Sequence, residues 1–240
     1  MTTRYVSAGR TVTGKIRKHN EDAILIRDDV GLWVVADGLG GHSAGDYAST
    51  MIVERLGALP RPGSVFDFIE TIEDTLVQIN ADLLQTAATR GVDLIGSTVV
   101  ILVHDKDFML CGWVGDSRAY CFEDDRLRQI TRDHVHGGED DVTHFGAASA
   151  PPQAGSGVLT RAVGAEEQLF VDWVIAANKS DTAFVLCSDG INKEMSDAEL
   201  DAECRRNPQP QDLVVSLFEL ALSRAGRDNI SAVVVRLQES

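Results

Sequence analysis

The segment that decides the fold is GLWVVADGLGGHSAGD, residues 31–46. Residues 32–36 form a short apolar run rich in β-branched and aromatic side chains, with glycines near both ends, which predicts a strand buried on both faces. The strand ends at Asp37, and a glycine-rich turn follows. A carboxylate at the rim of an apolar core is costly unless a cation pairs with it. The segment therefore predicts a buried strand that delivers Asp37 to a cation site.

The composition is that of a globular domain with an acidic surface. The chain has 240 residues, of which 44% are hydrophobic and 25% charged, and its formal net charge is -15. That charge argues against nucleic-acid or anionic membrane partners, which require a basic surface. An anionic substrate stays possible, because bound metal ions reverse the local charge. We expect a single domain over 1–240, because motifs spread from Arg17 to Asp228 must converge.

Targeting signals are not evident in the sequence. The first twenty residues contain no apolar core of a signal peptide, and no run of eighteen apolar residues predicts a membrane span. The four cysteines form no C-x-x-C pair, so a zinc ribbon or redox motif is not expected. We therefore expect a cytoplasmic protein with reduced cysteines.

Periodicity predicts a mixture of helices and antiparallel strands. Apolar residues recur at helical spacing over 43–59, 65–89, 197–205 and 212–224. We expect Ser43 and Ser196 to cap the first and third of these helices. Strands are predicted over 23–26, 98–103, 108–114, 119–122, 127–130, 169–175, 182–187 and 230–237. Those between 98 and 130 are joined by short turns and must pair antiparallel.

Residues 131–158 interrupt this pattern. The stretch is rich in Gly, Ala, Ser and Pro, and loops of this length are usually functional or disordered. Three of the six histidines, His134, His136 and His144, fall in it. No fixed ligand spacing on a regular element supports a metal site there, so we favour a solvated polar loop.

Four aspartates lie beside the ends of predicted strands. VVADG ends at Asp37, CGWVGD at Asp116 and VLCSDG at Asp189, and GRDN places Asp228 just before the last strand. Each motif alone is an ordinary turn. Together they bring four carboxylates to one place if the strands share a sheet.

Such a cluster suits hard divalent cations. Mg²⁺ and Mn²⁺ prefer carboxylate, carbonyl and water oxygens, and Gly38 has no Cβ to keep its carbonyl from a metal. Two ions about 4 Å apart would hold a bridging hydroxide in line with a phosphorus atom. Arg17, near Glu21 and Asp22, is the candidate for gripping a phosphate.

The motifs together resemble a known family. R-x-x-N-E-D-A, V-A-D-G-x-G-G-H, G-S-T, G-D-S-R, L-T-R-A-x-G, S-D-G and G-R-D-N occur here in the order found in the metal-dependent protein phosphatases (PPM, or type 2C, serine/threonine phosphatases), bacterial branch. The match spans about residues 10–237. It implies an α+β fold, a four-layer α/β/β/α sandwich of two central antiparallel sheets flanked by helices.

The resemblance also implies two Mn²⁺ or Mg²⁺ ions. Asp37 would bridge them, Gly38 would offer its carbonyl, and Asp189 and Asp228 would hold one ion. The catalytic set would be Asp37, Arg17 and Asp22.

Other residues would surround the two ions. Glu21 and Asp22 would orient metal-bound waters, and Arg17 would bind the substrate phosphate. Asp116 matches a third-metal position, and residues 133–158 match the flap beside the active site.

The sequence departs from the family at several positions. Many members carry an aspartate where this chain has Lys193, so we expect a third metal site that is weak or absent. Leu39 replaces the histidine that serves as general acid in animal relatives. His42 either packs against the turn or contacts the substrate as a general acid. The flap lacks the longer helical sequence of many bacterial members.

The implied function is hydrolysis of phosphoserine or phosphothreonine by direct attack of a metal-bridging hydroxide. We expect a monomer whose partners are a phosphoprotein substrate and a separately encoded serine/threonine kinase. Residues 188–194, SDGINKE, look like phosphatases that oppose a kinase controlling type VI secretion.

Two alternatives remain open. A pseudophosphatase would bind or scaffold a phosphoprotein without turnover, although such proteins usually lose metal carboxylates that this chain keeps. A phosphatase for another phospho-residue or a small phosphate would share the chemistry and differ in its groove.

Overall fold

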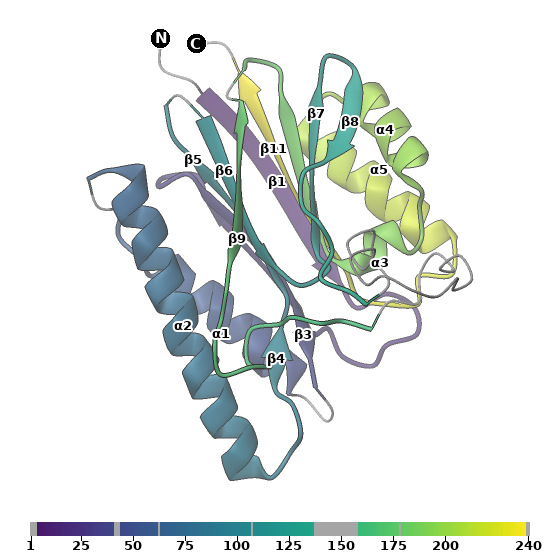
Figure 1. Ribbon diagram of the computed structural model, residues 1–240. Coiled ribbons are helices and arrows are strands. Elements are labelled where there is room, and N and C mark those ends of the chain that lie inside the picture. Colours follow the sequence, from purple (N-terminus) through teal and green to yellow (C-terminus); the bar gives the residue numbers. More distant parts are fainter. Residues whose placement is uncertain are drawn as a thin grey trace, which may run out of the picture.

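A computed structural model describes residues 4–40, 44–61, 63–106, 108–136, 158–177 and 179–238. Its centre is a pair of antiparallel sheets packed face to face, with helices on both outer sides (Figure 1). This arrangement confirms the four-layer sandwich implied by the sequence motifs.

Strands from the N-terminal and C-terminal parts of the chain pair within the first sheet. The first sheet runs, in spatial order, β1 (Arg4–Val12), β11 (Ile230–Gln238), β10 (Ala183–Cys187), β7 (Arg118–Glu123) and β8 (Arg126–Gln129). The second runs β2 (Asp22–Arg27), β3 (Leu32–Leu39), β5 (Val99–His104), β6 (Phe108–Val114) and β9 (Asp172–Ala177). The short β4 (Gly96–Ser97) pairs with the end of β3.

Helices cover the outer face of each sheet. Figure 1 shows α1 (Gly45–Gly57) and α2 (Val65–Arg90) on one side of the sandwich. On the other side lie α3 (Asp189–Asn192), α4 (Asp197–Arg206) and α5 (Pro210–Ser223). Within the described ranges, no helix combines the length and the apolar character needed to cross a membrane.

The strand sequences explain the layering. In β3, Leu32, Val34 and Ala36 face the core under α1 and α2. Trp33 and Val35, which point the other way, lie in the core between the sheets. Successive side chains along a strand point to opposite faces of the sheet. Only a run that is apolar at every position can therefore pack both against the helices and against the other sheet.

Some element boundaries differ from those predicted. No strand was predicted over residues 4–12, yet β1 pairs with β11 along its whole length. The strand predicted over 169–175 begins instead at Asp172. The capping role of Ser196 is confirmed, because its side chain accepts the Glu199 N–H in a capping box. The predicted cap Ser43 lies outside the described residues, and α1 begins after Ala44.

Candidate active site

The ends of strands from both sheets meet at one end of the sandwich. Asp22 opens β2 and faces Asp37 directly across the β2–β3 ladder. Asp189 follows β10, and Asp228 precedes β11. A cavity of about 240 Å³ is lined by the following residues: Arg17, Glu21, Asp37, Gly38, Leu39, Gly40, Asp116, Leu159, Asp189, Lys193, Asp228 and Asn229. The structure thus gathers all the predicted site residues that it describes around one cavity, except Asp22, which lies buried beside it.

Asp22 is a buried carboxylate with two hydroxyl donors. Its Oδ2 atom accepts hydrogen bonds from Ser188 Oγ at 2.8 Å and Ser231 Oγ at 2.6 Å. Its Oδ1 atom is buried and has no hydrogen-bond partner among the described residues. Burial raises the pKa of Asp22 to about 6, against the effect of the two hydroxyls. Neither serine was predicted to have a role, although Ser188 belongs to the S-D-G motif.

Asp37 lies among other carboxylates at the end of β3. Burial, together with the charges of Asp22 and Asp189, holds the pKa of Asp37 well above its usual range. Burial and the charge of Asp189 likewise raise the pKa of Asp116 to about 6. Like charges crowded in a poorly solvated place disfavour ionisation. A bound cation would relieve this repulsion.

The backbone of Asp37 is held by the G-S-T motif. The carbonyl of Asp37 accepts the Thr98 N–H at 2.9 Å and the Ser97 hydroxyl at 2.9 Å. Thr98 Oγ1 in turn lies 2.7 Å from Ser117 Oγ, in the turn that carries Asp116. The motif therefore fixes two of the acidic turns relative to each other.

Gly38 is required for packing. A Cβ at this position would lie 2.1 Å from the carbonyl oxygen of Gly45 and 2.6 Å from that of Glu21. Its N–H donates to the Glu21 carbonyl at 3.0 Å. The close approach of α1 to the end of β3 thus excludes any side chain, a reason that the sequence did not reveal.

Two cationic side chains reach the carboxylates. Arg17 Nη2 lies 2.8 Å from Asp228 Oδ1. Lys193 Nζ pairs with Asp189 and lies 3.2 Å from Asp228 Oδ2. Burial opposes the effect, but the hydrogen bond from Arg17 and the charge of Lys193 lower the pKa of Asp228.

The carboxylates do not form a closed ligand shell. Among the described residues, no three His, Cys, Asp or Glu side chains are arranged to hold a metal ion as they stand. The Asp189 Oδ1 atom is nevertheless buried without a partner in this part of the chain. Burial raises the pKa of Asp189, although Lys193 acts against the increase. His42, predicted to contact the substrate, lies outside the described residues, as does most of the predicted flap.

Asn229 ties the Arg17 loop to the sheet. Its Oδ1 atom accepts the Glu21 N–H at 2.9 Å. Its Nδ2 atom donates to the carbonyls of Thr13 and His19, each at 2.9 Å. The side chain is buried and makes all three bonds to the segment that carries Arg17. Asn229 belongs to the G-R-D-N motif, but no role was predicted for it.

Comparisons with known proteins agree with this geometry. The profile of the family described as Protein phosphatase 2C matches residues 15–232. The chain belongs to the protein phosphatase 2C family. The serine/threonine phosphatase stp of Listeria innocua is 31% identical, over 94% of this chain and 93% of that protein. As a member of this family with such relatives, the chain is an enzyme of the serine/threonine phosphatase class.

Two solved structures are similar to this chain over nearly its whole length. PppA, described as a key regulatory component of T6SS in Pseudomonas aeruginosa, superposes with a TM-score of 0.89 and 39% identity, over 98% of this chain and 99% of that chain. The catalytic domain of PstP in complex with 2 manganese ions superposes with a TM-score of 0.84 at 24% identity, over 99% and 100% of the two chains. The latter similarity shows the fold alone.

For this protein phosphatase 2C, we expect Asn229→Ala to weaken both the fold and phosphate binding. The change removes three hydrogen bonds and leaves the Glu21 N–H without its acceptor, so unfolding should become easier by about 2–4 kcal/mol. The Arg17 loop would also lose its attachment to the residue before β11. Arg17 would then be less well positioned, and KM for an aryl phosphate should rise about tenfold. Thermal unfolding and steady-state kinetics measure the two effects. Asn207→Ala, at the residue that follows α4 and does not line the cavity, should leave KM unchanged. An equal KM increase there would contradict the role of Asn229.

The stability of the metal-free phosphatase should fall as pH rises. Because burial and mutual repulsion raise the pKa values of Asp22, Asp37 and Asp116, the folded chain keeps protons that the unfolded chain has released. The unfolded state binds fewer protons, so the free energy of unfolding decreases between about pH 4 and pH 7. In chelator, the Tm should be several degrees lower at pH 7 than at pH 5. Saturating Mn²⁺ should remove this difference, and a Tm that rises with pH in chelator would contradict the prediction.

Proposed function

We propose that the chain is a metal-dependent phosphoprotein phosphatase that hydrolyses phosphoserine and phosphothreonine monoesters. The observation that carries the proposal is the convergence of Asp37, Asp189 and Asp228 on one cavity with raised pKa values at the first two. All of the donors are oxygens, as Mg²⁺ and Mn²⁺ prefer. The buried Oδ1 atoms of Asp22 and Asp189, which find no partner in the described part of the chain, are acceptors that a metal or its water would satisfy.

The positions of these residues around the cavity support the roles that we propose for them. Asp37, the Gly38 carbonyl, Asp189 and Asp228 would hold two ions. Such ions, when bound, neutralise phosphoryl oxygens and lower the pKa of a water that attacks phosphorus.

The remaining residues would act on water and substrate. Glu21 and Asp22 would orient water, with Asp22 itself held by Ser188 and Ser231. Arg17 would release Asp228 and grip the substrate phosphate, for which its half-exposed guanidinium is suitably placed. Asp116 would be left as a weak third-metal ligand, because Lys193 brings positive charge to that side of the cavity.

Hydrolysis of p-nitrophenyl phosphate tests the chemistry. We expect turnover that requires Mn²⁺ or Mg²⁺, stops in chelator and returns when metal is restored. Phosphothreonine and phosphotyrosine peptides of the same sequence test the substrate class, and the phosphothreonine peptide should be hydrolysed faster. Turnover that persists in chelator would contradict metal dependence, and a folded, metal-loaded protein without turnover would indicate a pseudophosphatase.

We further propose that the phosphatase opposes a serine/threonine kinase in the control of type VI secretion. The similarity to PppA over nearly the whole of both chains supports this. Phosphoproteomics of a deletion strain should show raised phosphorylation on proteins of that system. We also propose a cytoplasmic monomer, which fractionation and light scattering can check.

A further inference from the structure

His134 is a mostly buried histidine beside the cavity that the proposed chemistry does not use. Its side chain is 10% exposed. The Nδ1 atom accepts the Gly115 N–H at 3.0 Å, and the backbone N–H of His134 donates to the Gly115 carbonyl at 3.0 Å. The imidazole also stacks on Trp113, with ring centroids 6.1 Å apart and planes 17° apart. His134 thus holds the residue immediately before Asp116 from two directions.

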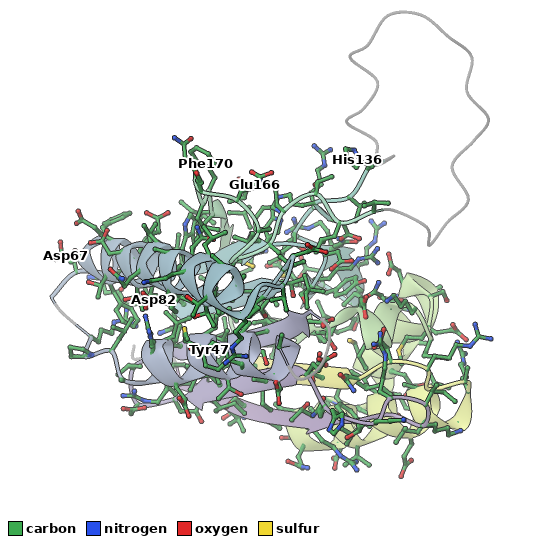
Figure 2. All side chains as sticks on the ribbon, turned by 90° about the horizontal axis from the view of Figure 1, so that it is seen from below. Tyr47, Asp67, Asp82, His136, Glu166 and Phe170 are labelled. Carbon is green, nitrogen blue, oxygen red and sulfur yellow. The ribbon has the colours of Figure 1, made fainter. Side chains whose placement is uncertain are left out.

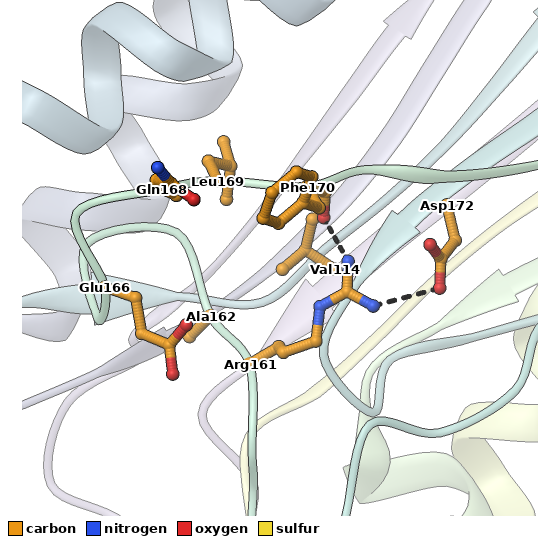
Figure 3. A pocket seen from close by; sticks show the side chains of 8 residues that line it. All are labelled: Val114, Arg161, Ala162, Glu166, Gln168, Leu169, Phe170 and Asp172. Atoms are coloured by element: carbon orange, nitrogen blue, oxygen red, sulfur yellow. Dashed lines mark hydrogen bonds and ion pairs between the residues drawn. The ribbon is translucent and has the colours of Figure 1, made fainter.

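The other edge of the imidazole meets a carboxylate. His134 Nε2 lies 2.8 Å from Asp172 Oδ2, at the start of β9. Arg161 Nη1 donates to the same oxygen at 3.0 Å and lies 3.0 Å from Nε2. Figure 3 shows Arg161 joined to Asp172 on one side and to the Phe170 carbonyl on the other.

These contacts fix the tautomer. An imidazole nitrogen that accepts a backbone N–H carries no proton, so the single proton of the neutral ring is on Nε2. There it donates to Asp172. Burial lowers the pKa of His134, against the opposing effect of Asp172, which favours this neutral form.

His134 also lies where the segment after Asp116 meets the segment that contains Leu159. Its carbonyl accepts the Thr160 N–H at 2.8 Å, and Val135 forms a β-bridge with Leu159. Leu159 lines the same cavity as Asp116. Figure 2 shows His136, Glu166 and Phe170 along the same side of the molecule.

The Gly115 turn depends on such support. Gly115 has a φ of +111°, and a Cβ there would lie 2.6 Å from the Thr98 side chain. A glycine in this conformation is free to relax unless outside groups hold its N–H and C=O. Both of these groups are held by His134.

We propose that His134 is a positioning residue that fixes the Asp116 turn against the Leu159 wall, with Asp172 holding the imidazole in the required tautomer. The inference rests on the proposed function, because it treats Asp116 as part of a phosphatase site. The coupling is one of geometry: a shift of Gly115 moves Asp116, and a shift of Leu159 changes the shape of the cavity.

Two near-isosteric substitutions separate the two edges of the ring. In His134→Asn the amide oxygen can reach the Nδ1 position and still accept the Gly115 N–H. In His134→Gln the amide reaches the Nε2 position and keeps the Asp172 contact, but the Gly115 N–H loses its acceptor. We expect kcat for p-nitrophenyl phosphate to stay within about threefold in the asparagine variant. In the glutamine variant it should fall at least about tenfold, with a smaller change in KM, as the loss of one buried hydrogen bond predicts.

Further measurements keep the result interpretable. His136 is exposed and lies two residues after His134, so His136→Gln should leave kcat unchanged. Thermal unfolding identifies variants that lose activity through misfolding. In ¹⁵N spectra the wild-type His134 ring should show a bare Nδ1 and a protonated Nε2, and the Gly115 amide resonance should move in the glutamine variant only. Equal kcat values for the folded asparagine and glutamine variants, or the opposite tautomer, would overturn the proposal. An inactive wild type would contradict the proposed function instead, while the tautomer would still test His134.

Discussion

Replacing Asp37 by asparagine is expected to lower kcat at least about a thousandfold at saturating Mn²⁺ while leaving the fold intact. The amide has nearly the same volume as the carboxylate, so the end of β3 and its bonds to Ser97 and Thr98 can remain. The negative charge that would bridge two cations is lost. Stabilisation of phosphoryl transfer is mainly electrostatic, so a bridging charge should count for several kcal/mol of activation free energy. Steady-state hydrolysis of p-nitrophenyl phosphate over a range of Mn²⁺ concentrations measures the effect.

The same substitution should not destabilise the metal-free protein. Burial and the surrounding carboxylates raise the pKa of Asp37, so removing its charge relieves both desolvation and repulsion. In chelator at pH 7, the Tm of Asp37→Asn should therefore equal or exceed that of the wild type. Asp74→Asn, an exposed change on α2, is the matched control and should alter neither activity nor Tm. Turnover retained by Asp37→Asn with Mn²⁺ present would exclude Asp37 as the bridging ligand.

Much of this site could be predicted because strands and turns carry their own signals. The run before Asp37 is apolar at every position, and the structure buries both of its faces. Strand ends in a sandwich converge, so an aspartate at each of several ends could be placed near the others before any coordinates. The two sheets bring Asp37 from one layer and Asp189 and Asp228 from the other to a single cavity.

The supporting contacts could not be predicted, because each joins residues far apart in sequence. Ser188 and Ser231 meet Asp22 across the interface of the two sheets, and neither has a local pattern that indicates this contact. The side chains of Asn229 and His134 bond to backbone atoms of other segments. Because every residue has these backbone atoms, the sequence does not indicate which ones are bound. β1 has a mixed sequence, RYVSAGRTV, and its register comes from β11 rather than from its own periodicity.

Lys193→Asp is expected to increase the number of Mn²⁺ ions bound and to tighten the apparent affinity at least about tenfold. In the wild type, the ammonium of Lys193 pairs with Asp189 and lies 3.2 Å from Asp228 Oδ2, so it competes with a cation for both proposed ligands. A unit charge about 4 Å from a divalent cation changes the free energy of cation binding by about 2 kcal/mol in water and about 8 kcal/mol at an effective dielectric constant near 20. The half-exposed position of Lys193 favours the lower end of this range. The aspartate reverses the charge and also supplies a carboxylate beside Asp116.

A neutral variant separates these two effects, and isothermal titration calorimetry measures both stoichiometry and affinity. Lys193→Met removes the competing cation without adding a ligand, so it should tighten binding of the first ions and leave the stoichiometry at the wild-type value. Only Lys193→Asp should bind an additional ion, since only it completes an acidic set with Asp116 and Asp189. Burial raises the pKa of both groups in the wild type, although Lys193 opposes the increase. If Lys193→Asp binds Mn²⁺ with the stoichiometry and affinity of the wild type, then Lys193 does not limit the site, and the charge of its ammonium must be screened from the ions by water.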